Sequence, residues 1–421
     1  ADFGRTIPSV FTDEPQFTRK QTLRYPQDQR DVTLPWTPDL PDTYRQADAG
    51  EDILDHLPEL LWDKPDGEIS RARYHYHDHV AERFAAAFAD QIGAWCEAHQ
   101  LCLTGHMMEE PTLESQTAAL GEAMRSYRSF QLPGIDMLCD FREFTTAKQA
   151  QSASRQYGRA GVLSELYGVT NWNFDFRGYK LQGDWQAALG VTLRVPHLSW
   201  LSMAGEAKRD YPATFNYQAP WYKTFHYLED HFARVNVAMT RGQAVVRLAV
   251  IHPVESYWLH WSDNSSSAGI RAQLDANFKN LTDWLLRAQL DFDFIAESLL
   301  PQLCPLAALT PQAAAAQGSV PGLPVGKMRY QTVLVPSVQT LRSSTLERLE
   351  RFRQAGGRVI FLGRIPELED ARPSQRGQAL AAACECLPLQ KEALLQALAP
   401  ERELSIYDQQ GILTDRQIGR A

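Results

Sequence analysis

Short apolar runs alternate with longer amphipathic stretches over the first 240 residues of the chain. Five of these runs have the length and composition of buried β-strands. They span residues 7–12, 101–104, 135–139, 161–164 and 191–195. Between the runs, apolar residues recur every three or four positions, as on one face of a helix, most clearly over residues 71–98. This alternation predicts an α/β fold in which helices wrap a parallel sheet.

Each of the five predicted strands is followed by a polar or ionisable residue. These residues are Glu14, Glu110, Asp140, Glu165 and His197. In a (β/α)8 barrel the active-site groups sit at the C-terminal ends of the strands. Five strands do not close such a barrel. We therefore expect residues 1–242 to hold strands four to eight of a TIM-type barrel, with the first three strands preceding residue 1.

A second pattern of strands and helices begins near residue 243. Predicted strands span residues 245–251, 290–295, 330–336 and 357–363, and predicted helices span 268–288 and 343–355. This pattern predicts a doubly wound, flavodoxin-like domain over residues 243–365. The loops lack GxGxxG and GxxxxGK[ST], so nucleotide binding has no support. Residues 366–421 receive no assignment beyond helical or irregular structure.

Charge and composition narrow the classes of partner. Lys and Arg total 42 against 51 Asp and Glu, a net charge of −9. An acidic chain lacks the basic stripe of nucleic-acid-binding proteins, and no run of 18 apolar residues predicts a membrane span. Six cysteines without CxxC spacing favour a reducing compartment such as the cytoplasm. We therefore expect neither a nucleic acid nor a membrane as partner.

Two strand-end carboxylates, Glu14 and Glu165, form the strongest chemical constellation. Glycoside hydrolysis uses two carboxyl groups that face one cleft. One is protonated and delivers its proton to the leaving oxygen, and the other acts as nucleophile or as base for water. The competing interpretation is that both are ordinary surface carboxylates paired with arginine. Their shared edge and the aromatic residues nearby favour catalysis.

A second acidic cluster, Glu109 and Glu110, follows His106. These groups could hold a hard cation, hydrogen-bond a sugar or raise the pKa of Glu14 by like-charge repulsion. The alternative is a helix N-terminus, where carboxylates favour the macrodipole and Pro111 fits the first turn. Together with Asp13, the pair forms a candidate set of metal ligands.

Three histidines alternate along the chain at His75, His77 and His79. On a strand they would share one face and could bind a metal ion. Because the sequence beyond them is helical, they would instead spread around a helix axis, which favours the start of a helix.

Several aromatic residues lie in predicted loops rather than at the spacing of a core. They are Trp36, Trp172, Trp200, Trp221 and Tyr222. Aromatic rings are common platforms for the apolar faces of sugar rings. The alternative for each ring is ordinary loop packing, but their concentration after strand ends favours a sugar-binding cleft.

Three segments resemble known glycoside hydrolases. Residues 164–172, SELYGVTNW, resemble the strand-seven signature of clan A β-galactosidases that carry a flavodoxin-like second domain. Residues 11–15, FTDEP, resemble the strand that supplies their acid, except that Asp13 stands where those enzymes have Asn. Residues 190–222 are more similar to large bacterial α-L-rhamnosidase-like hydrolases. The resemblance extends over residues 5–365.

The resemblance implies a glycosidase that cleaves a terminal sugar from an oligo- or polysaccharide. Glu14 would be the general acid and Glu165 the nucleophile or general base. Substrate contacts would come from His106, Glu110, Asp140, Asn171, Trp172, His197, Trp200 and Trp221. In the resembling β-galactosidases the second domain also forms contacts between copies of the chain, which predicts a homo-oligomer.

The two resemblances imply different stereochemistry. β-Galactosidase-like enzymes retain configuration without a catalytic metal, whereas rhamnosidase-like enzymes invert with a calcium ion near the sugar. The crowded acids and residues 190–222 favour inversion with calcium held by Asp13, Glu109 and Glu110. The alternatives are a retaining β-galactosidase-like enzyme, a non-catalytic sugar-binding relative, and a metallohydrolase that uses the histidines of residues 75–79.

Overall fold

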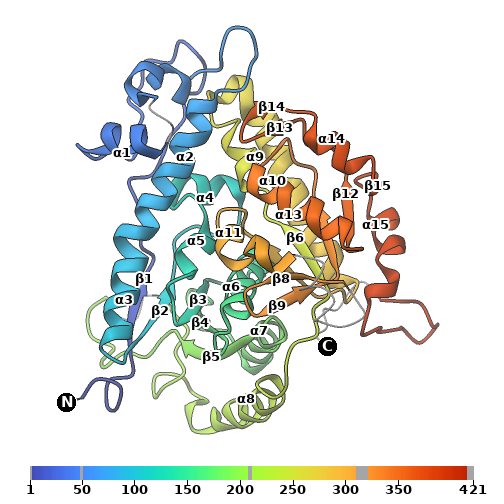
Figure 1. Cartoon of the computed structure of the whole chain (residues 1–421). Helices are drawn as coiled ribbons and strands as arrows, with labels where there is room; N and C mark the ends of the chain where they lie inside the picture. The colour runs from blue at the N-terminus through green and yellow to red at the C-terminus, as the bar shows by residue number, and fades with distance from the viewer. Residues whose placement is uncertain (1, 48–50, 207–210, 310–320, 415–421) are drawn as a thin grey trace.

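The computed structural model describes residues 2–47, 51–206, 211–309 and 321–414. It contains two five-stranded parallel sheets with helices packed against them (Figure 1). The first sheet runs in chain order through β1 (Ser9–Asp13), β2 (Cys102–His106), β3 (Leu132–Met137), β4 (Val162–Leu166) and β5 (Val191–Pro196). Every neighbouring pair is parallel. The predicted parallel sheet is thus confirmed, with each of its five strands overlapping a predicted one.

Helices connect these strands, and their sequences explain where they begin and end. They include α2 (Arg71–Phe84), α3 (Gln91–Ala98), α4 (Leu113–Ala119), α5 (Ala123–Tyr127), α6 (Phe144–Tyr157), α7 (Phe176–Ala188) and α8 (His226–Met239). Helix α2 starts where the Ser70 side chain accepts a hydrogen bond from the Arg73 amide. Helix α6 ends at Gly158, whose φ of 67° favours glycine.

The first sheet is open at both edges within the described residues. Strands β1 and β5 each pair on one side only. Both carry exposed apolar side chains, with Phe11 42% and Leu193 46% exposed. An edge strand with exposed apolar residues is unfavourable in water. Whether these strands belong to a (β/α)8 barrel stays a prediction.

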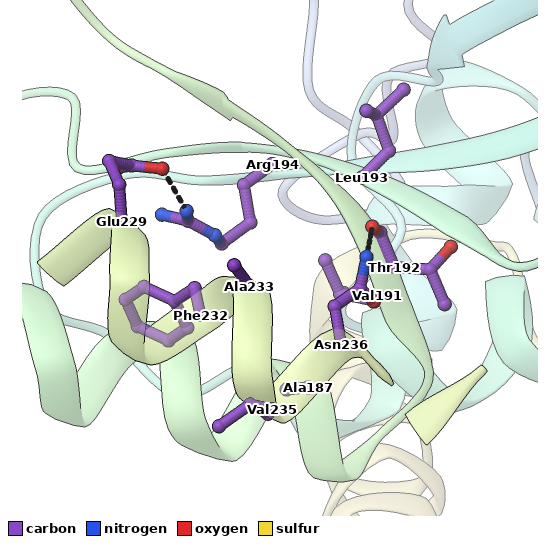
Figure 2. A pocket seen from close by; sticks show the side chains of 10 residues that line it. All are labelled: Ala187, Val191, Thr192, Leu193, Arg194, Glu229, Phe232, Ala233, Val235 and Asn236. Carbon is purple, nitrogen blue, oxygen red and sulfur yellow. Dashed lines mark hydrogen bonds and ion pairs between the residues drawn. The ribbon is translucent and has the colours of Figure 1, made fainter. Parts of the chain in front are cut away.

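Helix α8 covers part of the free edge at β5. The guanidinium of Arg194 lies 2.6 Å from Glu229 and 3.9 Å from the Phe232 ring centroid. The Asn236 side chain donates to the Thr192 carbonyl at 3.1 Å. These contacts surround a cavity of about 240 Å³, with Arg194 and Glu229 facing each other on one side (Figure 2). Because its one carboxylate is already paired, this cavity serves the packing of α8 on β5.

The second sheet has the order β15-β12-β10-β6-β7, again with only parallel pairs. Its strands are β6 (Leu248–Ile251), β7 (Phe292–Ile295), β10 (Thr332–Val335), β12 (Arg358–Leu362) and β15 (Glu385–Leu387). From β6 the chain adds β7 on one side and then β10, β12 and β15 on the other, so the order of strands changes direction between β6 and β10. Doubly wound sheets bind ligands at such a switch point, outside the carboxyl ends of the strands.

The helices of the second half are α9 (Val254–Trp258), α10 (Asn264–Arg287), α11 (Leu300–Leu303), α13 (Ser343–Gln354), α14 (Arg376–Ala381) and α15 (Lys391–Ala397). A hairpin of β8 (Leu323–Val325) and β9 (Met328–Tyr330) projects toward α6. The expectation of only helical or irregular structure after residue 365 is wrong, because β15 extends the second sheet. The three residues of β15 are too few and too polar to show a strand pattern.

One apolar core joins the two halves of the chain. It contains Leu103 and Ile135 of the first sheet together with Leu248 and Phe292 of the second. Helix α6 lies against β7, and α2 lies against α9. No helix among the described residues is both long and apolar enough to cross a membrane.

Candidate active site

Five ionisable side chains gather where the parallel strands of the first sheet end. Glu14 directly follows β1, His106 is the last residue of β2, and Glu165 lies near the end of β4. The register pairs Asp13 with His106, and Asp136 of β3 with Glu165. The structure therefore places Glu14 and Glu165, two of the five predicted strand-end residues, around His106, which was not one of those five.

His106 is the centre of this cluster. Its side chain is fully buried, and its Nε2 lies 2.9 Å from Glu165 Oε2 and 3.6 Å from Asp13 Oδ1. Burial alone would lower the pKa of His106. The hydrogen bond to Glu165 and the nearby carboxyls of Asp136 and Glu110 outweigh burial, so the pKa is raised.

Glu165 is held in its ionised form. Its hydrogen bond with His106 lowers its pKa, and partial burial opposes this only in part. His197 Nε2 lies 4.0 Å from the other carboxyl oxygen and favours the same charge state. Glu165 therefore has the properties of a nucleophile or a base.

Glu14 has the opposite electrostatic environment. Burial raises its pKa, and although His106 opposes the shift, the neighbouring carboxyls of Asp13 and Glu165 add to it. Its φ of 48° lies in the left-handed region, which is uncommon for a residue with a side chain. The amide of Glu14 donates to the His106 carbonyl at 3.2 Å, which fixes this turn beside β2. Glu14 therefore has the character of a proton donor.

Asp136 is a member of the cluster that the sequence analysis missed. Burial raises its pKa to about 7, and the charges of Glu165 and Glu14 add to the shift. Its Oδ1 is buried without a hydrogen-bond partner in the described structure. A charged residue inside the otherwise apolar run of residues 135–139 was the available signal. The analysis instead selected Asp140, which is exposed and lies beyond the end of β3.

Glu110 lies behind the cluster in a buried position. Burial raises its pKa to about 8. Tyr127 Oη lies 3.0 Å from Glu110 Oε1 and 2.9 Å from the Gly134 carbonyl oxygen. A tyrosine hydroxyl has one proton, so it satisfies both contacts only if it donates to Gly134 and accepts from a protonated Glu110. Glu110 is thus a buried, neutral group that packs against Tyr127 behind the cluster.

The predicted calcium ligands do not converge. Glu109 pairs with Arg19 at 2.5 Å, Glu110 is buried against Tyr127, and the Asp13 side chain is 75% exposed. Among the described residues, two groups bring ligand atoms within 4.8 Å of one another, and both include His106. Calcium takes six to eight oxygen ligands. These donor sets do not fit calcium, so calcium stays a prediction of the sequence resemblance.

The aromatic residues fall into two places. The rings of Trp172 and Trp200 pair with their centroids 5.2 Å apart. In the same loop as Trp172, the backbone amide of Asn171 donates a hydrogen bond to the Pro212 carbonyl. Trp221 instead packs beside Phe176, in the apolar cluster between α7 and α8. The contacts therefore group Trp172 with Trp200 but not with Trp221.

The three histidines of residues 75–79 lie in α2, as the helical alternative predicted. His77 is buried, and its Nδ1 lies 2.9 Å from Lys20 Nζ. His79 Nε2 instead lies 3.0 Å from the Thr43 hydroxyl. They point to different neighbours, and neither of the candidate metal groups found among the described residues includes them. The metallohydrolase alternative gains no support.

Comparisons with known proteins agree with the fold. No protein-family model matches the chain, and no curated sequence does. A rhamnosidase from Novosphingobium sp. PP1Y matches 88% of this chain with a TM-score of 0.62 at 17% identity. A β-galactosidase from Bacillus circulans sp. alkalophilus matches 80% of it with a TM-score of 0.51 at 13% identity. The chain covers 35% of the rhamnosidase and 50% of the β-galactosidase. At this identity the likeness concerns the fold, and both structures are of glycosidases.

Proposed function

We propose that the protein is a glycoside hydrolase in which Glu14 is the general acid and Glu165 is the nucleophile or general base. The observation that carries this proposal is that Glu14 and Glu165 end strands of one parallel sheet and lie around the buried His106, whose Nε2 is 2.9 Å from Glu165 Oε2. The environments of the two carboxyls also shift their pKa values in opposite directions. Burial raises the pKa of Glu14, whereas the hydrogen bond with His106 lowers that of Glu165. Two neighbouring titratable groups whose environments separate their pKa values mark an acid and a base.

In this mechanism, the protonated Glu14 donates its proton to the glycosidic oxygen as the bond from that oxygen to the anomeric carbon breaks. Glu165 either attacks that carbon to form a glycosyl-enzyme or takes a proton from the water that attacks it. His106 is a positioning residue, because its contact with Glu165 fixes the carboxylate and keeps it charged. No step requires a metal ion.

Two features of the fold support a finer assignment. Free edges at β1 and β5, each with exposed apolar residues, fit strands four and eight of a (β/α)8 barrel. The order of the second sheet is the flavodoxin-like order 2-1-3-4-5. We accordingly assign the catalytic unit to residues 1–242 and a flavodoxin-like unit to residues 243–365, now extended to include β15. The substrate is a terminal sugar of an oligo- or polysaccharide, with α-L-rhamnosides tested first.

A panel of nitrophenyl glycosides tests the proposal. The panel includes the α-L-rhamnopyranoside and the β-D-galactopyranoside, and each is assayed with the wild type, Glu165→Gln and Glu229→Gln. Glu229 is the matched control, because it is a paired carboxylate beside β5. Hydrolysis that disappears only in Glu165→Gln supports the proposal. Proton NMR of the first product then distinguishes retention from inversion.

If the protein hydrolyses no glycoside yet binds sugars, and Glu165→Gln weakens that binding, it is a non-catalytic relative. Equal and mild losses in Glu165→Gln and Glu229→Gln would show that both carboxylates are structural. Either result contradicts the proposed hydrolase.

A further inference from the structure

A cavity of about 460 Å³ lies at the opposite end of the first sheet from the carboxylates. Its walls come from the starts of β4 and β5, from the end of α6, from the connection that begins at Met239, and from the β8–β9 hairpin of the second half. In Figure 1 this hairpin lies beside α6. The Lys327 amide donates to the Gln156 carbonyl at 2.8 Å, which joins the two parts. The cavity is large enough for a small organic ligand.

The charged side chains around this cavity are all cationic. Arg155, Arg159, Lys327 and Arg329 line it, and no Asp or Glu does. Arg155 is already neutralised, because it lies 2.8 Å from Asp291 and 2.9 Å from Asp293. Over the described ranges, Lys327 and Arg329 form no ion pair. In a protein of net charge −9, a cavity that has no acidic residue in its lining and two lysine or arginine side chains outside any ion pair of the described residues is unexpected.

Two buried donors without partners also line the cavity. Gln151 is 2% exposed, and its Nε2 has no hydrogen-bond partner in the described structure. The amide orientation is fixed, because its Oε1 accepts a hydrogen bond from Lys148 Nζ. Nε2 therefore points the other way, beside Gly190, which also lines the cavity. The Nε of Arg159 is likewise buried without a partner. Buried donors left unpaired are costly, and an acceptor ligand removes that cost.

From these observations we propose that the cavity binds a small molecule carrying an oxyanion, a phosphate, sulfate or carboxylate group. Gln151 and Arg159 would donate to its oxygens, and Lys327 and Arg329 would balance its charge. The ligand would touch both halves of the chain. It would not take part in hydrolysis, because residues at the N-terminal face of such a sheet contribute to stability rather than chemistry.

The end of α6 offers another explanation for one of the cations, since lysine near a helix C-terminus is favourable. However, three of the last four carbonyls of α6 already accept backbone hydrogen bonds. Gly158 and Arg159 donate their amides to Arg155 and Ser154, and Lys327 donates its own amide to Gln156. This leaves the Lys327 ammonium group and the unpaired donors of Gln151 and Arg159 unexplained.

Calorimetric titration of the purified protein with sodium phosphate, sodium sulfate and sodium citrate tests the proposal. Sodium chloride at matched ionic strength is the reference. We expect saturable binding of at least one oxyanion, weakened at least tenfold in the double variant Lys327→Gln/Arg329→Gln. Gln151→Glu should abolish binding, because it places a carboxylate in the cavity while still accepting from Lys148. Lys279→Gln, an exposed lysine elsewhere, should bind like the wild type.

Which anion binds identifies the ligand chemistry. Phosphate and sulfate without citrate indicate a compact tetrahedral group, and citrate alone indicates a carboxylate. If circular dichroism shows that Gln151→Glu does not fold, the test rests on the anion affinity of the double variant Lys327→Gln/Arg329→Gln. Heats no larger than those of chloride, or equal binding in the double variant and wild type, would overturn the proposal. Because binding is measured without turnover, the result is independent of the proposed hydrolase.

Discussion

The carboxyl ends of the two sheets both collect buried charged groups, yet they use them differently. At the end of the first sheet, Glu14 and Glu165 lie around His106, with His197 4.0 Å from Glu165, and among the described residues no arginine forms an ion pair with either carboxyl. At the end of the second sheet, Arg342 lies 2.7 Å from Asp78 of α2 and also pairs with Glu255 of α9. Asp78 in turn accepts from Arg125 at 2.7 Å.

The cations account for the difference in pKa. Burial would raise the pKa of Asp78, but Arg342 and Arg125 outweigh it and hold that pKa well below its usual range. For Glu14 and Asp136, His106 alone opposes the effect of burial, so the pKa values of both carboxyls rise. Asp78, which pairs with two guanidinium groups, therefore stays ionised near neutral pH, whereas Asp136, whose pKa is about 7, can exchange a proton there. The first cluster is therefore suited to chemistry and the second to holding the two halves together.

The second cluster also fills the switch point between β6 and β10. His252 follows β6, and Glu297 follows β7 and accepts the Arg342 amide at 2.8 Å. Side chains of α2 and α5 from the first half complete the cluster. The position where a doubly wound sheet would bind a ligand is thus occupied by the protein itself.

The largest expected effect is on the first cluster. Glu165→Gln removes the carboxylate that forms a hydrogen bond with His106, so we expect kcat to fall about 10⁴-fold for good and poor leaving groups alike. Steady-state assays with nitrophenyl and natural glycosides measure it. Glu229→Gln should change kcat less than about twofold, within the small effect expected for an exposed pair. A similar loss in both variants would show that Glu165 is no more important for hydrolysis than a paired surface carboxylate.

Glu14→Gln should show a dependence on the leaving group. A general acid contributes about 10²–10⁴-fold, mainly where the departing oxygen needs a proton. We expect a loss in this range for alkyl glycosides and a much smaller loss for 4-nitrophenyl glycosides. A loss independent of the leaving-group pKa would contradict the role of Glu14 as acid.

The sequence predicts one cluster far better than the other. Glu14, His106 and Glu165 are found because parallel strands place their ends at one edge, so local patterns determine a shared position. Asp136 was not predicted because the sequence pattern puts the end of this strand at residue 139, whereas β3 ends at Met137, one residue after Asp136. The ion pair of Arg342 with Asp78 joins residues 264 apart along the chain, and nothing in the local pattern at either residue indicates it.

The aromatic loops show the same limit. Trp172 and Trp221 both follow strand ends in the sequence, but one pairs with Trp200 and the other packs between helices. Loops have no periodicity that tells which side chains meet. Which tryptophan meets which neighbour is therefore decided by tertiary packing.

Breaking the second cluster should affect stability rather than chemistry. Arg342→Met leaves Glu255 without its guanidinium partner, and disrupting a buried ion pair costs roughly 3–5 kcal/mol. Urea unfolding followed by tryptophan fluorescence measures this free energy. The folded fraction should keep the wild-type kcat. A large loss of kcat with unchanged stability would give the second half a catalytic share.

His106→Phe should shift the pH profile. The variant preserves most of the volume but removes the hydrogen bond that lowers the pKa of Glu165. Glu165 would then stay protonated to higher pH, so the acid limb of kcat/KM should move to higher pH. The profile is measured with 4-nitrophenyl glycosides between pH 3 and 9. An unchanged acid limb would show that His106 only fills space.

The smallest expected effect concerns Glu255, the acid of the second cluster whose pKa burial raises to about 7. The native state then binds a proton that the unfolded chain releases near its ordinary value of 4.5. This contribution to stability is present in full below about pH 4.5 and is lost as the pH rises to about 7. His252, whose pKa burial lowers to about 4, acts in the opposite direction, because stability falls as it is protonated on acidification.

Glu255→Gln removes the contribution of Glu255 to this pH dependence and leaves that of His252. Its free energy of unfolding should therefore fall less than that of the wild type between pH 5 and 8, by about 1–3 kcal/mol at 1.36 kcal/mol per pKa unit. Urea unfolding at several pH values compares the two slopes, and Glu229→Gln, whose carboxylate is partly exposed, is the matched control. Parallel curves for wild type and Glu255→Gln would mean that Arg342 keeps Glu255 ionised throughout, as it does Asp78.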